Sequence, residues 1–104
     1  MDKLEQLTAE TLEGAVGRPG ITVIDFWAGW CGPCKSMAPV FETAARTLEP
    51  RARFIKIDVD AEPALAEQLG VRGIPALFLF KDGKVAEHHA GLADIHLLDR
   101  WTRS

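Results

Sequence analysis

The sequence lacks four features that would each point to a different class of protein. It has no stretch near the roughly 18 apolar residues that a membrane-spanning helix needs, and its polar first residues lack the apolar core of a secretory signal. It has no surplus of positive charge, since the formal net charge is −3, which argues against binding to nucleic acid or to anionic membranes. It also has no repeat or low-complexity segment. We therefore expect one cytoplasmic domain that covers residues 1–104.

Cysteine is scarce, and both copies, Cys31 and Cys34, lie in one short stretch. They follow an apolar run, residues 21–27, that is typical of a buried strand, and they precede a predicted helix. Positions i and i+3 share one face of a helix, so the two Cα atoms fall within the window that a disulfide needs. The positive end of a helix also stabilises a thiolate and lowers the pKa of its thiol. The pattern predicts a redox-active dithiol.

Two other interpretations of the cysteine pair are less favoured. A structural zinc site needs four ligands, and only His88, His89 and His96 could supplement the pair. His88 and His89 would point to opposite sides of a strand, so we expect no metal site. A purely structural disulfide would close a very short loop and would remove little entropy from the unfolded chain. Cytoplasmic thiols are kept reduced, which also favours catalysis over a structural role.

The hydrophobic pattern predicts an α/β fold in which a central mixed sheet has helices on both faces. We expect a short edge strand at 4–7 and a helix at about 9–16, followed by strands at 21–27 and 52–60 on either side of a helix at about 34–48 with a kink at Pro39. A short helix from about Pro63 to Gly70 should come next. The chain should then form a strand at 76–80, an Asp82-Gly83 turn, an antiparallel edge strand at 85–89 and a last helix capped by Asp94. For the first two elements, a plain helical arm without a strand is the alternative. Ile95, Leu98 and Trp101 form an apolar stripe on the last helix, which we interpret as core packing.

Several of these motifs together resemble the thioredoxin family. They are Asp25-Phe26-Trp27-Ala28, Trp30-Cys31-Gly32-Pro33-Cys34-Lys35, Gly73-Ile74-Pro75, Phe80-Lys81-Asp82-Gly83 and Gly91, in the family's order and spacing. The resemblance covers nearly the whole chain. It implies a five-stranded mixed sheet flanked by four helices, and reversible dithiol–disulfide exchange with protein disulfides.

The resemblance also implies a role for each motif residue. Cys31 matches an exposed attacking cysteine and Cys34 a buried resolving cysteine. Asp25 matches a buried acid beneath them, and Lys56 matches a lysine near that acid. The residues implied to bind substrate are Trp30, Gly32, Pro33, Gly73, Ile74, Gly91 and Pro75, the last as a cis-proline that faces the dithiol.

Three of these residues, and Leu92 next to Gly91, can also be interpreted without the family. Asp25 is the one charged residue in an apolar strand, so desolvation should raise its pKa, although pairing with a surface lysine is the alternative. Trp30 lies among small residues and is expected in an exposed loop rather than in the core. Ile74 and Leu92 fit a docking surface and plain core packing equally well.

The predicted function is that of a protein-disulfide reductase without a bound cofactor. The resemblance implies that electrons come from NADPH through a separate thioredoxin reductase, and that the partners are disulfide-containing proteins; we expect a monomer. The alternative is a redox-silent binding module or subunit of the same fold.

Gly29 and Ala76 depart from the commonest family pattern, which leaves the fine substrate preference open. His88 and His89 are interpreted as solvated side chains of the edge strand.

Overall fold

The computed structural model describes residues 5–6, 20–49 and 51–103. Its elements are β1 (Glu5–Gln6), β2 (Ile21–Trp27), α2 (Gly32–Leu48), β3 (Arg53–Asp58), α3 (Pro63–Gln68), β4 (Ala76–Lys81), β5 (Lys84–Ala90) and α4 (Ile95–Trp101). The helix predicted at about 9–16 lies outside the described residues. No helix in the described ranges is long and apolar enough to cross a membrane.

The five strands form one mixed sheet, as predicted, and they lie in the order β1-β3-β2-β4-β5. β3 pairs in parallel with both β1 and β2, whereas β4 runs antiparallel to β2 and to β5. The short strand at Glu5–Gln6 confirms the edge strand and rules out the alternative of an arm without a strand. Strand β2 lies in the middle, so its residues are buried from Ile21 to Phe26, in keeping with its nearly continuous apolar sequence.

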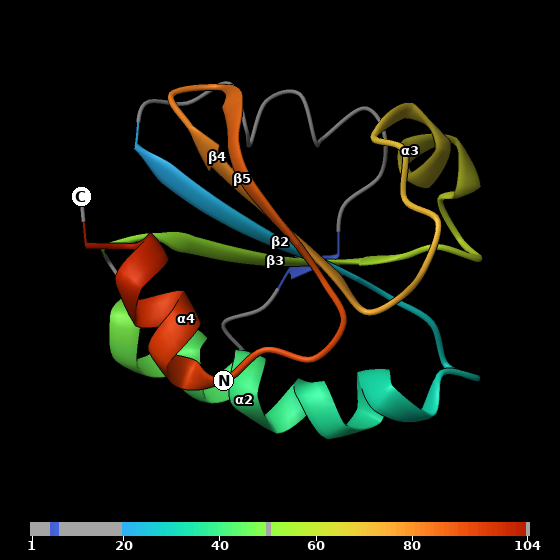
Figure 1. The fold of residues 1–104 in the computed structure, drawn as a ribbon, viewed down its shortest axis with the longest axis horizontal. Coiled ribbons are helices and arrows are strands. Elements are labelled where there is room, and N and C mark those ends of the chain that lie inside the picture. The colour runs from blue at the N-terminus through green and yellow to red at the C-terminus, as the bar shows by residue number, and fades with distance from the viewer. Residues whose placement is uncertain (1–4, 7–19, 50, 104) are drawn as a thin grey trace.

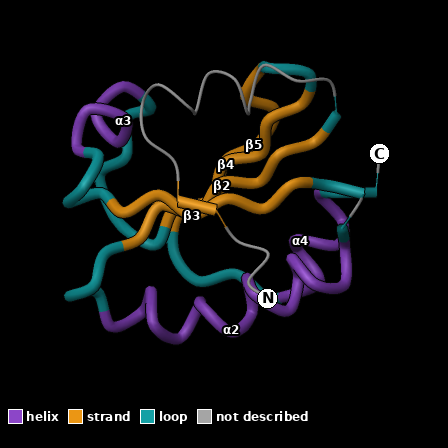
Figure 2. Tube along the Cα trace, turned by 180° about the vertical axis from the view of Figure 1, so that it is seen from behind, coloured by secondary structure: helices purple, strands orange, loops and turns teal. Residues whose placement is uncertain are grey.

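Helices cover both faces of the sheet (Figure 1, with the reverse view in Figure 2). α2 and α4 lie on one face, and α3 lies on the other. Because side chains alternate along a strand, β2 sends Val23 toward α2 and sends Ile24 and Phe26 toward α3. Asp25 shares its parity with Val23 and therefore faces α2. This register is what brings a buried carboxyl group under the helix that begins at the cysteines.

Helix α2 begins at Gly32, earlier than the predicted start at about residue 34. The reason is local: Cys31 acts as the N-cap, and Pro33 occupies the first turn, where its missing N–H costs nothing. Pro39 lies inside the helix as expected.

Strand β3 ends at Asp58, two residues before the predicted end, and there the Asp58 side chain accepts a hydrogen bond from the Asp60 N–H at 2.9 Å.

The predicted hairpin turn, the end of α3 and the cap of α4 are confirmed. Asp82 and Gly83 have positive φ angles of 51° and 87°, as a tight turn between two strands requires. Gly70 has φ of 72° just after α3, where glycine is favoured because it lacks a Cβ atom. The Asp94 side chain accepts a hydrogen bond from the Leu97 N–H at 3.0 Å and caps α4. Leu98 of that helix is fully buried in the core beside α2.

Candidate active site

The two cysteines form a disulfide at the N-terminus of α2, with their Cα atoms 5.2 Å apart. A turn after β2 delivers them: the Cys31 N–H donates to the Ala28 carbonyl at 3.2 Å. The Sγ atom of Cys31 accepts a hydrogen bond from the Cys34 N–H at 3.1 Å. That N–H is one of the unpaired donors of the helix end, so it is aimed at the sulfur atom that would hold negative charge after reduction. The geometry therefore provides a helix N–H that would stabilise a thiolate on the reduced Cys31.

The exposure of Cys31 implied by the resemblance is wrong for this disulfide form. Cys31 is only 4% exposed and Cys34 only 5%. Both pack with Ala28 in a small apolar cluster that also contacts Val59 and Ile74. Accessible surface therefore does not distinguish an attacking cysteine from a resolving one. The distinction comes from the surroundings of each sulfur atom.

The loop before β4 lies against Cys31. The Ile74–Pro75 peptide bond is cis, as the resemblance implied, and the Ile74 carbonyl oxygen lies 3.8 Å from the Cys31 Sγ atom. The Pro75 carbonyl accepts a hydrogen bond from the Gly91 N–H at 2.9 Å. Gly91 has φ of 92°, a conformation that favours glycine. Residues far apart in the chain thus line one rim of the disulfide.

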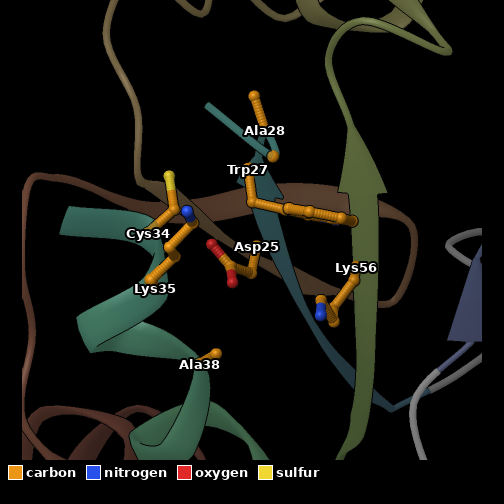
Figure 3. Close-up of a pocket in the computed structure, with 8 residues that line it drawn as sticks. Asp25, Trp27, Ala28, Cys34, Lys35, Ala38 and Lys56 are labelled. Carbon is orange, nitrogen blue, oxygen red and sulfur yellow. The ribbon is translucent and has the colours of Figure 1, made fainter. Parts of the chain in front are cut away.

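Asp25 lies beneath Cys34 and is almost fully buried, at 2% exposure (Figure 3). Burial raises the pKa of Asp25 from its ordinary 3.8 to about 7, and the positive charge of Lys56 opposes that rise. Lys56 lies opposite Asp25 on the adjacent strand β3, but Asp25 Oδ1 has no hydrogen-bond partner among the described residues. Lys56 instead places its Nζ atom 4.5 Å from the centroid of the Trp27 ring. The predicted raised pKa is confirmed over the lysine-paired alternative.

A cavity of about 100 Å³ connects these groups. It is lined by Asp25, Trp27, Ala28, Gly29, Cys34, Lys35, Ala38 and Lys56 (Figure 3). Cys34 lines this cavity and Cys31 does not, which is the asymmetry that exposure fails to show. The space is large enough for water beside the unpartnered carboxyl oxygen. A proton released by Cys34 would therefore have an acceptor, Asp25, that lines the same cavity.

Trp30 stands out from the surface beside the disulfide, with 69% of its area exposed, as predicted. Its Nε1 atom donates a hydrogen bond to the Asp60 carboxylate at 2.8 Å, which fixes the ring. The ring forms one wall of a groove of about 360 Å³. The remaining lining residues are Val59, Ala66, Val71, Arg72, Gly73 and Ile74.

Sequence reasoning placed Gly73 and Ile74 in the docking surface but missed other residues. Ile74 lines the groove and also packs against the core, so its position is compatible with both interpretations left open for it. Leu92 is 58% exposed, which excludes plain core packing for that residue. Asp60 was not predicted to take part in the site; its contact with Trp30 spans 30 positions, and no local pattern could have revealed it.

The histidines do not converge. His88 pairs across the sheet with Phe78, and His89 pairs with Leu77, so the two rings leave opposite faces of β5 as predicted. In the part of the chain that the structure describes, no three His, Cys, Asp or Glu side chains lie close enough to hold a metal ion. His89 does have a contact of its own, to the Leu92 carbonyl.

Comparison with known proteins agrees with the motif pattern. A family model described as thioredoxin matches residues 3–103. The thioredoxin of Chlamydia muridarum is 52% identical over 75 residues, which are 72% of this chain and 72% of that protein. The thioredoxin of Chlamydia trachomatis is 51% identical over the same shares. Two solved structures align over 99% of this chain: a Malassezia sympodialis thioredoxin, with TM-score 0.87, 32% identity and 91% of that chain covered, and a Halobacterium salinarum thioredoxin variant, with TM-score 0.86, 38% identity and 94% covered.

Proposed function

Because the chain belongs to the thioredoxin family and is a thiol–disulfide oxidoreductase, we propose that Cys31 attacks protein disulfides and that Cys34 resolves the product. The observation that supports this order is the position of the disulfide at the start of α2. Cys31 accepts a helix N–H and lies against Ile74, which lines the groove, whereas Cys34 borders the cavity that holds Asp25. Gly32 and Pro33 between them keep the two sulfur atoms within bonding reach in the first turn.

The reaction consists of two exchanges that move two electrons. The Cys31 thiolate attacks one sulfur atom of the substrate disulfide, forms a mixed disulfide and releases the other substrate sulfur as a thiolate. The Cys34 thiolate then attacks the Cys31 Sγ atom, closes the Cys31–Cys34 disulfide and releases the second substrate thiolate. The substrate gains two electrons, and the protein dithiol loses them. The second step is fast because Cys34 is already within disulfide reach of Cys31.

Cys34 must lose a proton before it attacks. We assign that proton to Asp25, which is buried in the same cavity and has a pKa raised to about 7. A base with a pKa near the working pH is the most effective proton acceptor. Lys56 limits the rise of the Asp25 pKa through its positive charge and keeps part of the carboxyl population ionised at neutral pH.

Substrate docking is assigned to the exposed rim around Cys31. Trp30 offers a large aromatic face, and Gly73 and Ile74 continue the surface along the groove. Pro75 and Gly91 close the other side through the hydrogen bond between them. An extended substrate segment with its disulfide over Cys31 would contact both sides at once.

The remaining parts of the proposal concern the setting of the protein. We propose that it acts as a single domain and as a monomer in the cytoplasm, holds no cofactor and is returned to the dithiol by a thioredoxin reductase that draws on NADPH. A coupled assay with such a reductase and a disulfide protein tests this: NADPH oxidation should depend on both added proteins. Absence of turnover would leave the alternative, a redox-silent binding module.

A trapping experiment separates the two functions directly. Cys34→Ser should accumulate mixed disulfides through Cys31, because resolution is removed and attack is retained. A variant with both cysteines changed to Ser should lose these partners. A redox-silent binding module would retain its partners in the double variant.

A further inference from the structure

We propose that His89 is a positioning residue that holds the rim segment 90–92 in the shape required for docking of protein disulfides. Its Nε2 atom lies 2.9 Å from the Leu92 carbonyl oxygen, three positions later in the chain. His89 belongs to β5, where it pairs with Leu77, so its backbone is fixed by the sheet. The ring therefore connects the loop that follows β5 to the sheet. The inference rests on the proposed docking surface.

The segment is held by two contacts, and one of them leads to the disulfide. The His89 contact holds the Leu92 carbonyl, and the Gly91 N–H donates to the Pro75 carbonyl at 2.9 Å. Pro75 follows Ile74, whose carbonyl oxygen lies 3.8 Å from the Cys31 Sγ atom. Between the two fastenings, Leu92 exposes 58% of its surface. A large apolar side chain is thus held in the open on a segment that contacts the rim of the redox site.

The contact decides that the Nε2 atom of the His89 ring carries a hydrogen. A carbonyl oxygen can only accept a hydrogen bond, so Nε2 of His89 must carry the hydrogen. The neutral tautomer with hydrogen on Nε2 satisfies this requirement, and so does the imidazolium ion. The contact therefore survives protonation of the ring. His88 offers a contrast, because its ring leaves the opposite face of β5 and stacks on Phe78 with centroids 5.0 Å apart.

A held segment should favour protein substrates and leave small ones unaffected. Docking of a folded protein must order every surface segment that it touches, and an ordered segment removes that entropy cost in advance. A small disulfide reaches Cys31 without contacting Leu92. Loss of the hydrogen bond should therefore weaken protein docking while the rate of the sulfur exchange stays the same.

The experiment compares His89→Leu with His89→Gln in single-turnover oxidation of the reduced protein. Insulin serves as the protein disulfide and bis(2-hydroxyethyl) disulfide as the small one, with samples quenched by alkylation. For His89→Leu, the half-saturating insulin concentration should rise about three- to tenfold, and the limiting rate should not change. Gln can place an amide N–H near the position of Nε2 and should stay within about twofold of wild type. The rate with the small disulfide should be the same in all three proteins.

The control variant is His88→Leu, which makes the same chemical change at the neighbouring position. It loses the stack on Phe78, so it can lower stability, but it should keep the wild-type insulin concentration dependence. An unchanged insulin dependence in His89→Leu, a defect that Gln does not repair, or equal slowing with the small disulfide would each overturn the inference. A wild-type protein that exchanges with neither disulfide would instead overturn the proposed function.

Discussion

Asp25 shows how one residue can be kept at a cost in stability for the sake of chemistry. It interrupts an otherwise apolar strand, and its Oδ1 atom has no hydrogen-bond partner among the described residues. An ionised carboxyl group in such a place is strongly disfavoured. The shift of its pKa from 3.8 to about 7 corresponds to on the order of 4 kcal/mol of stability lost in the fully ionised form.

Asp25→Asn should stabilise the oxidised protein, and the gain should depend on pH. Between the unfolded and folded pKa values, the folded state binds more protons than the unfolded state, so wild-type stability falls as pH rises from about 4 to about 7 and then levels off. Asn has a similar shape but no charge. The gain should therefore grow across this window and reach about 2 kcal/mol or more at pH 8.5, measured by denaturant unfolding at pH 5, 7 and 8.5.

The same variant should resolve its mixed disulfide more slowly, since Asn cannot accept the proton of Cys34. General-base removal of this kind costs about a hundredfold or more in rate. Single-turnover release of a substrate thiol from a mixed disulfide at Cys31 measures the step. A lower stability at pH 8.5 would mean that Asp25 is a satisfied partner in the fold, and an unchanged release rate would assign the proton to another acceptor.

Trp30→Ala should reduce the rate with insulin by about tenfold or more, because a large exposed aromatic face beside the reacting sulfur is typical of residues that dominate binding. The rate with a small disulfide should change by less than about twofold. Asp60→Ala should have a smaller effect in the same direction, since it removes the hydrogen bond that orients the ring and leaves the ring in place. Equal slowing with both substrates would contradict a docking role for Trp30.

Most single strands, turns and helix caps could be predicted from the sequence, because each depends on interactions between residues that are close together in the chain. The apolar run of β2, the Asp-Gly turn and the cap of α4 each depend on residues adjacent in the chain, and each was predicted. The start of α2 was placed too late because Cys31 is an unusual capping residue. A sulfur atom that accepts a helix N–H is a feature of the redox site, so the error fell at a functional position.

Helix α4 should depend strongly on its cap, because it has only one turn on each side of its centre. Asp94 accepts the Leu97 N–H, and Asp94→Ala should lower the free energy of unfolding by about 1 kcal/mol. Asp94→Ser is the matched control, since its hydroxyl can accept the same hydrogen bond. Denaturant midpoints of the three proteins decide the matter, and equal midpoints for Ala and Ser would show that the cap does not stabilise the helix.

At the scale of the whole molecule, the site is assembled from segments that no local pattern connects. The register of β2 on β3 places Lys56 beside Asp25, and the loop before β4 brings Ile74 to Cys31. Only the coupled motifs of the family predicted this assembly from the sequence. The groove wall at Val71 and Arg72, the Trp30–Asp60 contact and the His89–Leu92 contact were not predicted, because they depend on the three-dimensional path of loops.

The last prediction concerns how α4 is joined to the segment before β3, away from the redox site. Asp99 of α4 pairs with Arg51, which precedes β3, and with Arg103, each at 2.7 Å. Hydrogen bonds from the Arg51 and Arg103 side chains lower the pKa of Asp99 below its ordinary 3.8. In contrast to Asp25, Asp99 therefore contributes stability above that value, and the contribution is lost as pH falls below it.

Asp99→Asn should accordingly lower the denaturant midpoint at pH 6, and the difference from wild type should shrink toward pH 3. It should also shrink in 1 M salt, because exposed ion pairs are screened. Glu87→Gln on the exposed edge strand removes the same charge without these partners and should leave the midpoint near that of wild type. A midpoint difference for Asp99→Asn that persists unchanged at pH 3 and in high salt would mean that packing of the side chain, and not its charge, joins α4 to the segment before β3.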